Sequence, residues 1–227
     1  MKFNDKVFQE LTLEFEKKGF KESKHFEHNY CFEFYKKSEF ANSICVIRIL
    51  YSFDNKHLSG ITSRISFNNV TSILKKFVDV GTEFYDQTST NFLHSTESKS
   101  NISFLQKIIL TSPVEFELLK DKIIEHVNTY IIPIFEEISN LQKLNEKIFK
   151  VPQSKYCDYI YGESNLKALI IMKLCNNPKY NEFKTWLIDT YKKLSVTEPE
   201  QYSKDYDIIL NLIEYLDIDQ YKKLLKA

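Results

Sequence analysis

The segment from residue 112 to residue 150 constrains the fold most, because a strong helix start is followed by a proline inside a helical pattern. Ser112 is a good N-cap, Pro113 suits the first helical position, and Glu115 is placed to close a capping box. Apolar residues recur at helical spacing on both sides of Pro133. Proline removes one backbone hydrogen bond and clashes with the carbonyl four residues earlier. The sequence therefore predicts a kinked helix, or two helices that meet close to Pro133.

The residues before this segment indicate a helix followed by a small sheet. A helix is predicted over residues 5–18, ending at Gly19. Three strand patterns follow, at residues 26–35, 43–52 and 60–67. The middle one is apolar on both faces, which is typical of a central strand. The short connections favour an antiparallel meander, because a parallel pair needs a longer crossover.

The segment between the predicted sheet and Ser112 is ambiguous. A helix capped by Asn69 comes first. Residues 91–94 and 102–110 then suit strands, although 104–110 suit a helix equally well. We predict strands for this segment.

After residue 152 the pattern is helical throughout. Ser164 is a candidate cap for one helix, residues 180–195 form another, and Thr197 with Glu200 suggests a capping box for a third. The predicted fold class is α+β: an antiparallel sheet of three to five strands with flanking helices, followed by an all-helical C-terminal unit packed on it. The predicted domains are residues 1–152 and 153–227, or one continuous domain.

Composition narrows the functional classes. The 31 basic and 31 acidic residues cancel, and only Arg48 and Arg64 are arginines, which argues against nucleic-acid binding. No stretch approaches the apolar length of a signal peptide or a membrane span. We therefore predict a cytoplasmic protein with reduced thiols and no membrane partner. The histidines and cysteines lack metal-ligand spacing, and no phosphate-binding glycine loop is present, so we expect no metal or cofactor.

One charged constellation is predicted on the sheet. A symmetric turn between the second and third strands would set Arg48 beside Arg64, with Glu33 on the other neighbouring strand. Two guanidiniums and one carboxylate leave a surplus positive charge, which suits a small carboxylate or phosphate ligand. The alternative is a structural cross-strand ion pair, the commoner role of such groups on a sheet.

A second candidate site is the connector before the C-terminal helices. It alternates tyrosines with acids, a composition that resembles a protein-binding patch. Its residues are Tyr156, Asp158, Tyr159, Tyr161 and Glu163. The alternative is that these aromatic side chains are buried between packed units.

Residues 1 to about 150 resemble a family of uncharacterised bacterial α+β domains. The resemblance rests on the order of the elements and on the segments LTLEFEKKGF (11–20), CFEFY (31–35) and YIIPIF (130–135). Some of those domains are immunity-protein-like in polymorphic toxin systems. The resemblance implies no catalytic residue, and it favours a binding protein.

Three functional hypotheses follow. The first is a non-catalytic cytoplasmic protein that binds another protein, such as an immunity-type inhibitor that occludes a toxin surface. The second is a small-anion-binding protein or an enzyme, with a site between the sheet and the C-terminal helices. The third is a structural or assembly subunit. The sequence favours the first, and it leaves the oligomeric state open.

Overall fold

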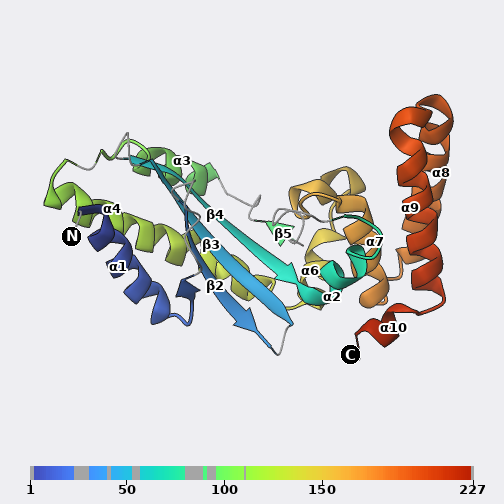
Figure 1. Cartoon of the computed structure of the whole chain (residues 1–227), viewed down its shortest axis with the longest axis horizontal. Helices are drawn as coiled ribbons and strands as arrows, with labels where there is room; N and C mark the ends of the chain where they lie inside the picture. Colours follow the sequence, from blue (N-terminus) through green and yellow to red (C-terminus); the bar gives the residue numbers. More distant parts are fainter. Residues whose placement is uncertain are drawn as a thin grey trace. The chain divides into compact units, whose positions relative to one another are not determined.

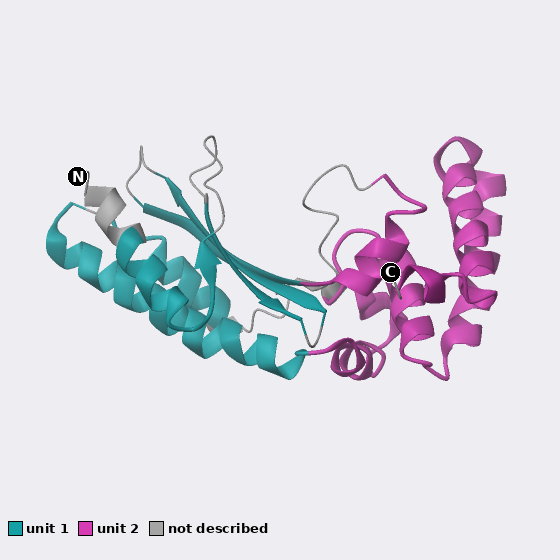
Figure 2. Cartoon of the chain, turned by 60° about the horizontal axis from the view of Figure 1, so that its bottom comes forward, with its two compact units in different colours: residues 1–65, 90–139 teal, residues 66–89, 140–227 magenta. Residues whose placement is uncertain are grey.

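A computed structural model describes residues 3–22, 31–39, 42–52, 57–79, 89–90, 96–109 and 111–225. The chain forms two compact units, residues 1–65 with 90–139 and residues 66–89 with 140–227 (Figure 2). A sheet is followed by a chain that is mostly helical, which confirms the predicted α+β class. The predicted domain boundary after residue 152 stays a prediction, because compactness alone does not show that a unit folds independently.

The sheet of unit 1 is a meander. Its order is β1-β2-β3-β4-β5, so strands that follow one another in the sequence are neighbours. The strands are β1 (Lys21–Glu22), β2 (Cys31–Ser38), β3 (Ser43–Ser52), β4 (His57–Phe67) and β5 (Ser89–Thr90). The pairs β1–β2 and β2–β3 are antiparallel. The predicted strand at 43–52 has the bounds of β3, and β4 begins three residues before the predicted Gly60. The first part of the predicted strand 26–35 lies outside the described residues.

The register of β2 against β3 decides which side chains enter the core. Phe34 pairs with Ile47 and Glu33 pairs with Arg48. Because directly paired residues share a face and successive residues alternate, the apolar pair and the charged pair lie on opposite faces. Phe34 and Ile47 are fully buried in the core of unit 1.

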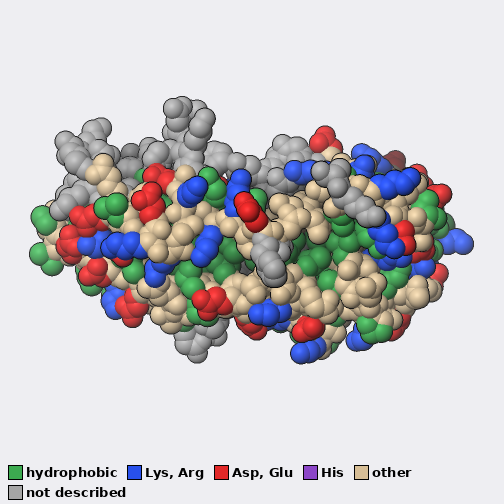
Figure 3. All heavy atoms as spheres, turned by 90° about the horizontal axis from the view of Figure 1, so that it is seen from below, with side chains coloured by type: hydrophobic (Ala, Val, Ile, Leu, Met, Phe, Trp, Pro, Cys, Tyr) green, Lys and Arg blue, Asp and Glu red, His purple; other side chains and the backbone are tan. Residues whose placement is uncertain are grey.

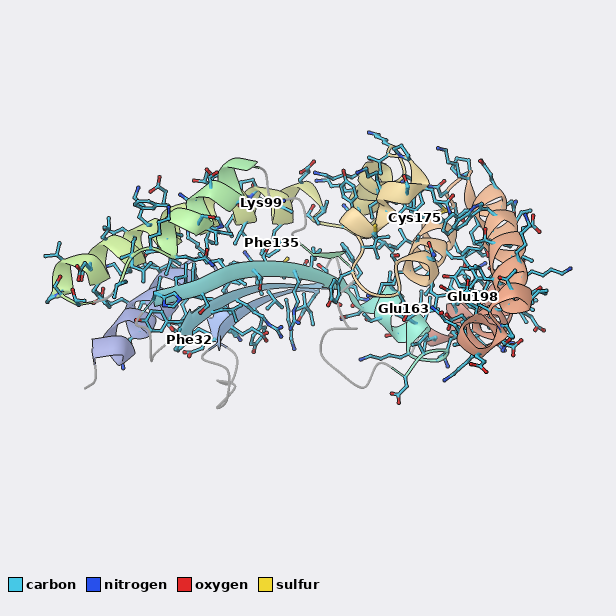
Figure 4. All side chains as sticks on the ribbon, turned by 90° about the horizontal axis from the view of Figure 1, so that it is seen from above. Phe32, Lys99, Phe135, Glu163, Cys175 and Glu198 are labelled. Carbon is cyan, nitrogen blue, oxygen red and sulfur yellow. The ribbon has the colours of Figure 1, made fainter. Side chains whose placement is uncertain are left out.

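Helices of unit 1 supply the other half of this core. They are α1 (Phe3–Glu16), α3 (Thr96–Leu105), α4 (Pro113–His126) and α5 (Ile132–Glu137) (Figure 1). Leu11 and Phe15 of α1 are fully buried, and Phe15 meets Phe34 edge to face at 4.6 Å between ring centroids. Gly19 adopts φ +81°, the left-handed conformation that ends a helix, as predicted. Phe135 of α5, labelled in Figure 4, also belongs to this core.

The proline-interrupted segment behaves as predicted at both its start and its break. The Ser112 backbone N–H donates to Glu115 Oε2 at 2.7 Å, and the Glu115 N–H donates to Ser112 Oγ at 3.4 Å, which completes the capping box. Between α4 and α5 lies a π-helical turn, Val127–Ile131. The wider turn accommodates Pro133, which follows at the start of α5, where its missing N–H costs little.

Four local predictions were wrong, and the fourth, the cap at Ser164, is described with unit 2 below. Residues 102–105 are not a strand but the end of α3, because α3 packs against α4, where Asn101 Oδ1 lies 2.9 Å from His126 Nδ1. Asn69 does not cap its helix, since α2 (Asn68–Leu74) begins one residue earlier with Phe67 at the cap position. Thr197 is the last residue of a helix, and its hydroxyl donates back to the Lys193 and Leu194 carbonyls.

Unit 2 is built around one fully enclosed helix. Its elements are α2, α6 (Leu141–Ile148), the 3-10 turn η2 (Gln153–Asp158), α7 (Ser164–Leu174), α8 (Tyr180–Thr197), α9 (Pro199–Asp217) and α10 (Tyr221–Leu224). Every residue of α7 from Leu166 to Met172 is buried, so α7 packs on all its sides. Glu163 occupies the cap position of α7 in place of the predicted Ser164, without a side-chain cap hydrogen bond.

The last long helices form a hairpin. Figure 1 shows α8 and α9 side by side, in orange and red, and they contact each other extensively. Tyr180 Oη and Lys184 Nζ on α8 donate to opposite oxygens of Asp217 at the end of α9, each at 2.9 Å. None of the described helices combines the length and the apolar character that crossing a bilayer requires.

Candidate functional site

The predicted constellation of Glu33, Arg48 and Arg64 is assembled on the sheet. Arg48 Nε donates to Glu33 Oε2 at 2.5 Å, and Arg64 Nη2 donates to the same oxygen at 3.1 Å. Antiparallel pairing of β2 and β3 places Glu33 directly opposite Arg48, and β4 supplies Arg64 from the next strand. The three side chains are only 10–13% exposed. We call this group the arginine clamp.

The geometry of the arginine clamp fits a structural role. One carboxylate oxygen accepts from two guanidiniums, so Glu33 links three neighbouring strands on a single face. Charge-assisted hydrogen bonds of this kind are strong when they are shielded from water, and breaking one side of them is costly. An anionic ligand would have to compete with Glu33 for the same donors, so anion binding at these residues stays a prediction.

The structure divides the predicted connector patch. Tyr156 is only 6% exposed, and its ring packs between Phe149 at 4.9 Å and Phe183 at 5.8 Å. It is therefore a core residue of unit 2. Tyr159 and Tyr161 are half-buried. Asp158 ends η2, and its side chain lies outside the described part of the structure.

Glu163 is the connector acid whose surroundings are clearest. Its burial and the nearby charge of Asp205 on α9 raise the pKa of its carboxyl, although the Lys167 ammonium opposes that shift. Lys167 is fully buried within α7, and its Nζ donates to the Tyr161 carbonyl at 2.7 Å. The connector is thus tied to α7, and its acid lies close to the helical hairpin.

The hairpin itself was missed as a functional feature. Leu187 is the last buried residue of α8 and Ile209 is the first of α9, and no residue from 188 to 208 is buried. This distal half nevertheless carries apolar and aromatic side chains on both helices. We call them the distal hairpin surface: Ile188, Tyr191, Leu194, Val196, Tyr202, Tyr206 and Ile208.

Contacts connect the distal hairpin surface to the start of α7. Asn165 Nδ2 donates to Tyr191 Oη at 3.3 Å, and the Tyr191 ring meets the Tyr202 ring edge to face at 6.2 Å. Figure 4 labels Glu163 at the start of α7 and Glu198 at the hairpin turn. The half-buried rings of Tyr191 and Tyr202 and the carboxyl of Glu163 thus lie among the same helices of unit 2, α7, α8 and α9.

The sequence carries the apolar pattern of this surface, but periodicity alone does not show which part of that pattern is buried. In the helix predicted over residues 180–195, Tyr191 and Leu194 share one apolar stripe with Phe183 and Leu187. Only the structure shows that the stripe is fully buried in its first half and only half-buried in its second. Half-buried Leu194 and exposed Val196 lie next to the hairpin turn, where a third packing partner is least expected.

In the described parts of the chain, no cluster of three or more His, Cys, Asp or Glu residues could hold a metal ion. Burial raises the pKa of the Cys45 thiol to about 12 and that of Cys175 to about 11, so both are poor nucleophiles near neutral pH. Cys157 is an exposed free thiol on η2.

No family model, curated protein or solved structure matches this chain. The resemblance of residues 1 to about 150 to immunity-like domains therefore stays a prediction.

Proposed function

We propose that this chain is a non-catalytic, cytoplasmic protein-binding protein whose partner docks on the distal hairpin surface. One observation carries the proposal: residues 188–208 include seven apolar or aromatic side chains, and none of these residues is buried. Amphipathic helices bury their apolar stripes against something, and a larger uncovered apolar area is typical of an interaction site. The area of the stripe beyond Leu187 is what a partner would cover.

The composition of the surface supports a protein partner. Tyrosine provides a large contact area and a hydrogen-bonding hydroxyl at low entropic cost, and three tyrosines lie on the distal hairpin surface. The same residues, 188–208, contain three lysines and five acids, a local net charge of −2. A partner with basic residues around an apolar centre would complement this surface.

The mechanism we propose is occlusion, as in an immunity-type inhibitor of a toxin. Such a protein needs no catalytic group, because a rigid surface that covers a partner's active site blocks access to substrate. The internal hydrogen bonds of Asp217 to both Tyr180 and Lys184 fix α8 against α9 at the base of the hairpin. A pre-organised hairpin loses little entropy on binding.

Two valines provide a matched test. Val196 on the distal hairpin surface and Val114 on α4 are both helical and both 77% exposed, so Asp at either position leaves the core intact. Tagged full-length protein, Val196→Asp and Val114→Asp are used to capture proteins from the native host, and each captured protein is quantified by mass spectrometry. We expect one partner to be retained by Val114→Asp and lost about tenfold or more with Val196→Asp, a change of about 1.4 kcal/mol.

The inhibitor mechanism has its own readout. The captured partner is expressed alone and together with each variant, and growth is measured. We expect wild type and Val114→Asp to relieve toxicity and Val196→Asp to fail. Capture that is equal for all three proteins would contradict the docking surface, and a partner that is harmless when expressed alone would contradict toxin inhibition.

A further inference from the structure

A hollow of about 460 Å³ opens on unit 2 beside the buried connector residue Tyr156. Its walls come from three elements: Gln153 and Cys157 from η2, Asn165 from the start of α7, and Trp186 from α8. The volume falls in the range of about 300–1,000 Å³ that small-molecule sites occupy. None of these wall residues belongs to the distal hairpin surface or to the arginine clamp.

Trp186 forms a supported platform at the edge of the hollow. Its indole stacks on Phe183, with 5.6 Å between ring centroids and 22° between planes, and it is 39% exposed. Phe183 in turn packs on Tyr156, and Tyr156 packs on Phe149. A series of rings from the core to the surface holds the indole in place, so a ligand that stacks on it does not have to order it first.

The polar wall offers neutral donors and acceptors. Gln153 lines the hollow, and its Nε2, which is shielded from solvent in the free chain, has no hydrogen-bond partner among the described residues. Such a donor is costly to leave unsatisfied. Asn165 is held by its hydrogen bond to Tyr191 Oη, which fixes the direction of its amide. Ser154 and Ser164 add hydroxyls, which both donate and accept.

Charge excludes most phosphorylated and anionic ligands. Among the described residues, no Lys, Arg, Asp or Glu lines the hollow. Burial, and to a lesser degree the Glu182 carboxylate, raises the pKa of the Tyr156 phenol. A nucleotide or an organic acid would therefore enter the hollow without a counter-charge.

We infer that this hollow is a binding site for a neutral sugar. A pyranose ring presents an apolar C–H face, which packs on one indole, and a rim of hydroxyls that both donate and accept hydrogen bonds. The wall supplies the matching parts: one exposed ring, two amides and two serine hydroxyls. A nucleobase has two π-faces that can stack. Among the described residues that line the hollow, Trp186 alone offers an exposed ring, since Tyr156 is enclosed between Phe149 and Phe183.

The chain carries its own reporter for this site, because Trp186 is the single tryptophan. Full-length protein is titrated with glucose, galactose, N-acetylglucosamine and cellobiose while the indole fluorescence is followed, and saturation-transfer NMR detects the bound sugar independently. Adenine and inorganic phosphate serve as the competing ligand classes. We expect saturable binding of at least one sugar with a dissociation constant of about 1 mM or lower.

Variants locate the binding. Gln153→Leu removes the amide at similar volume, Trp186→Ala removes the platform, and Gln142→Leu on the exposed face of α6 is the matched control. We expect Gln153→Leu to weaken the sugar about tenfold, Trp186→Ala to abolish its NMR signal, and Gln142→Leu to change neither. Circular dichroism confirms that each variant is folded. Bound sugar should also slow alkylation of Cys157, measured as the difference between wild type and Cys157→Ser.

Three results would overturn the inference: no saturable binding of any of the four sugars, binding that survives both Gln153→Leu and Trp186→Ala, or binding of adenine in their place. None of them bears on partner capture, which depends on Val196 and the distal hairpin surface. The two proposals therefore stand or fall separately.

Discussion

Glu33 accepts hydrogen bonds from Arg48 and Arg64 through one carboxylate oxygen. Much of the stability that polar side chains give the sheet therefore depends on this one residue. We expect Glu33→Gln to lower the free energy of unfolding by about 3 kcal/mol, because it leaves two shielded guanidiniums without the charge they share. Urea denaturation measures the loss. Glu39→Gln, at an exposed position just after β2, is the control and should cost less than about 0.5 kcal/mol. Equal stability of the two variants would show that the arginine clamp contributes little.

Glu163 gives the stability of unit 2 a pH dependence of known sign. Its pKa in the folded protein is raised, so the folded state holds the proton more tightly than the unfolded state. The folded state therefore loses stability as pH rises through the interval between the ordinary and the raised pKa. Glu163→Gln removes this loss, and we expect the variant to gain stability relative to wild type as pH rises above the ordinary glutamate pKa of about 4.3. Thermal unfolding over that range measures it, and a constant difference would contradict the assigned burial.

At the level of single residues, sequence reasoning succeeded where the relevant contact is fixed by strand geometry. Glu33, Arg48 and Arg64 were predicted to meet because pairing and alternation leave few choices. The burial of Tyr156 was left open, because its outcome depends on Phe149 and Phe183, whose approach no local rule fixes. The platform role of Trp186 was missed for the same reason.

The helix start at Ser112 is the element whose energetics follow most directly from sequence. Ser112→Ala removes the hydroxyl that accepts from the Glu115 N–H and should destabilise the protein by about 1 kcal/mol. Ser103, at an exposed position inside α3, is the matched control. Ser103→Ala should leave stability unchanged or raise it slightly, since Ala is the better helix former. A loss at Ser103 as large as that at Ser112 would rule out the capping explanation.

The helical hairpin should respond differently along its length. Leu187 is fully buried, so Leu187→Ala should cost about 3 kcal/mol through the cavity it leaves. Leu194, two turns further along α8, is only half-buried, so Leu194→Ala should cost less than about 1 kcal/mol. Chemical denaturation compares the pair. Similar losses at both positions would mean that the distal half has a core of its own.

Local signals located the Pro133 break and the Ser112 capping box correctly. The caps predicted at Asn69, Ser164 and Thr197 were wrong, as was the strand predicted at residues 102–105. The Pro133 break and the capping box depend on backbone chemistry that acts within a few residues. The run at residues 102–105 fits either secondary structure, and its packing on α4 decided for the helix. The distal half of the hairpin was not predicted for the same reason, because an apolar stripe in the sequence does not show which of its residues another element buries.

At the scale of the whole molecule, charge and apolar surface give different information. Figure 3 shows Lys and Arg intermingled with Asp and Glu across one face, in keeping with equal numbers of basic and acidic residues. A mixed surface does not steer one class of charged partner over long distances. Recognition by this chain would therefore depend on local shape and apolar contact, which the distal hairpin surface provides.

The central claim is that a protein partner covers residues 188–208. Amide hydrogen exchange of the full-length chain, alone and saturated with the captured partner, measures this coverage directly. We expect amides in this segment, which are hydrogen-bonded within α8 and α9 but carry no buried side chain, to exchange faster in the free protein than those of the enclosed helix α7, and to become strongly protected in the complex. Protection confined to other segments, with residues 188–208 unchanged, would contradict the account.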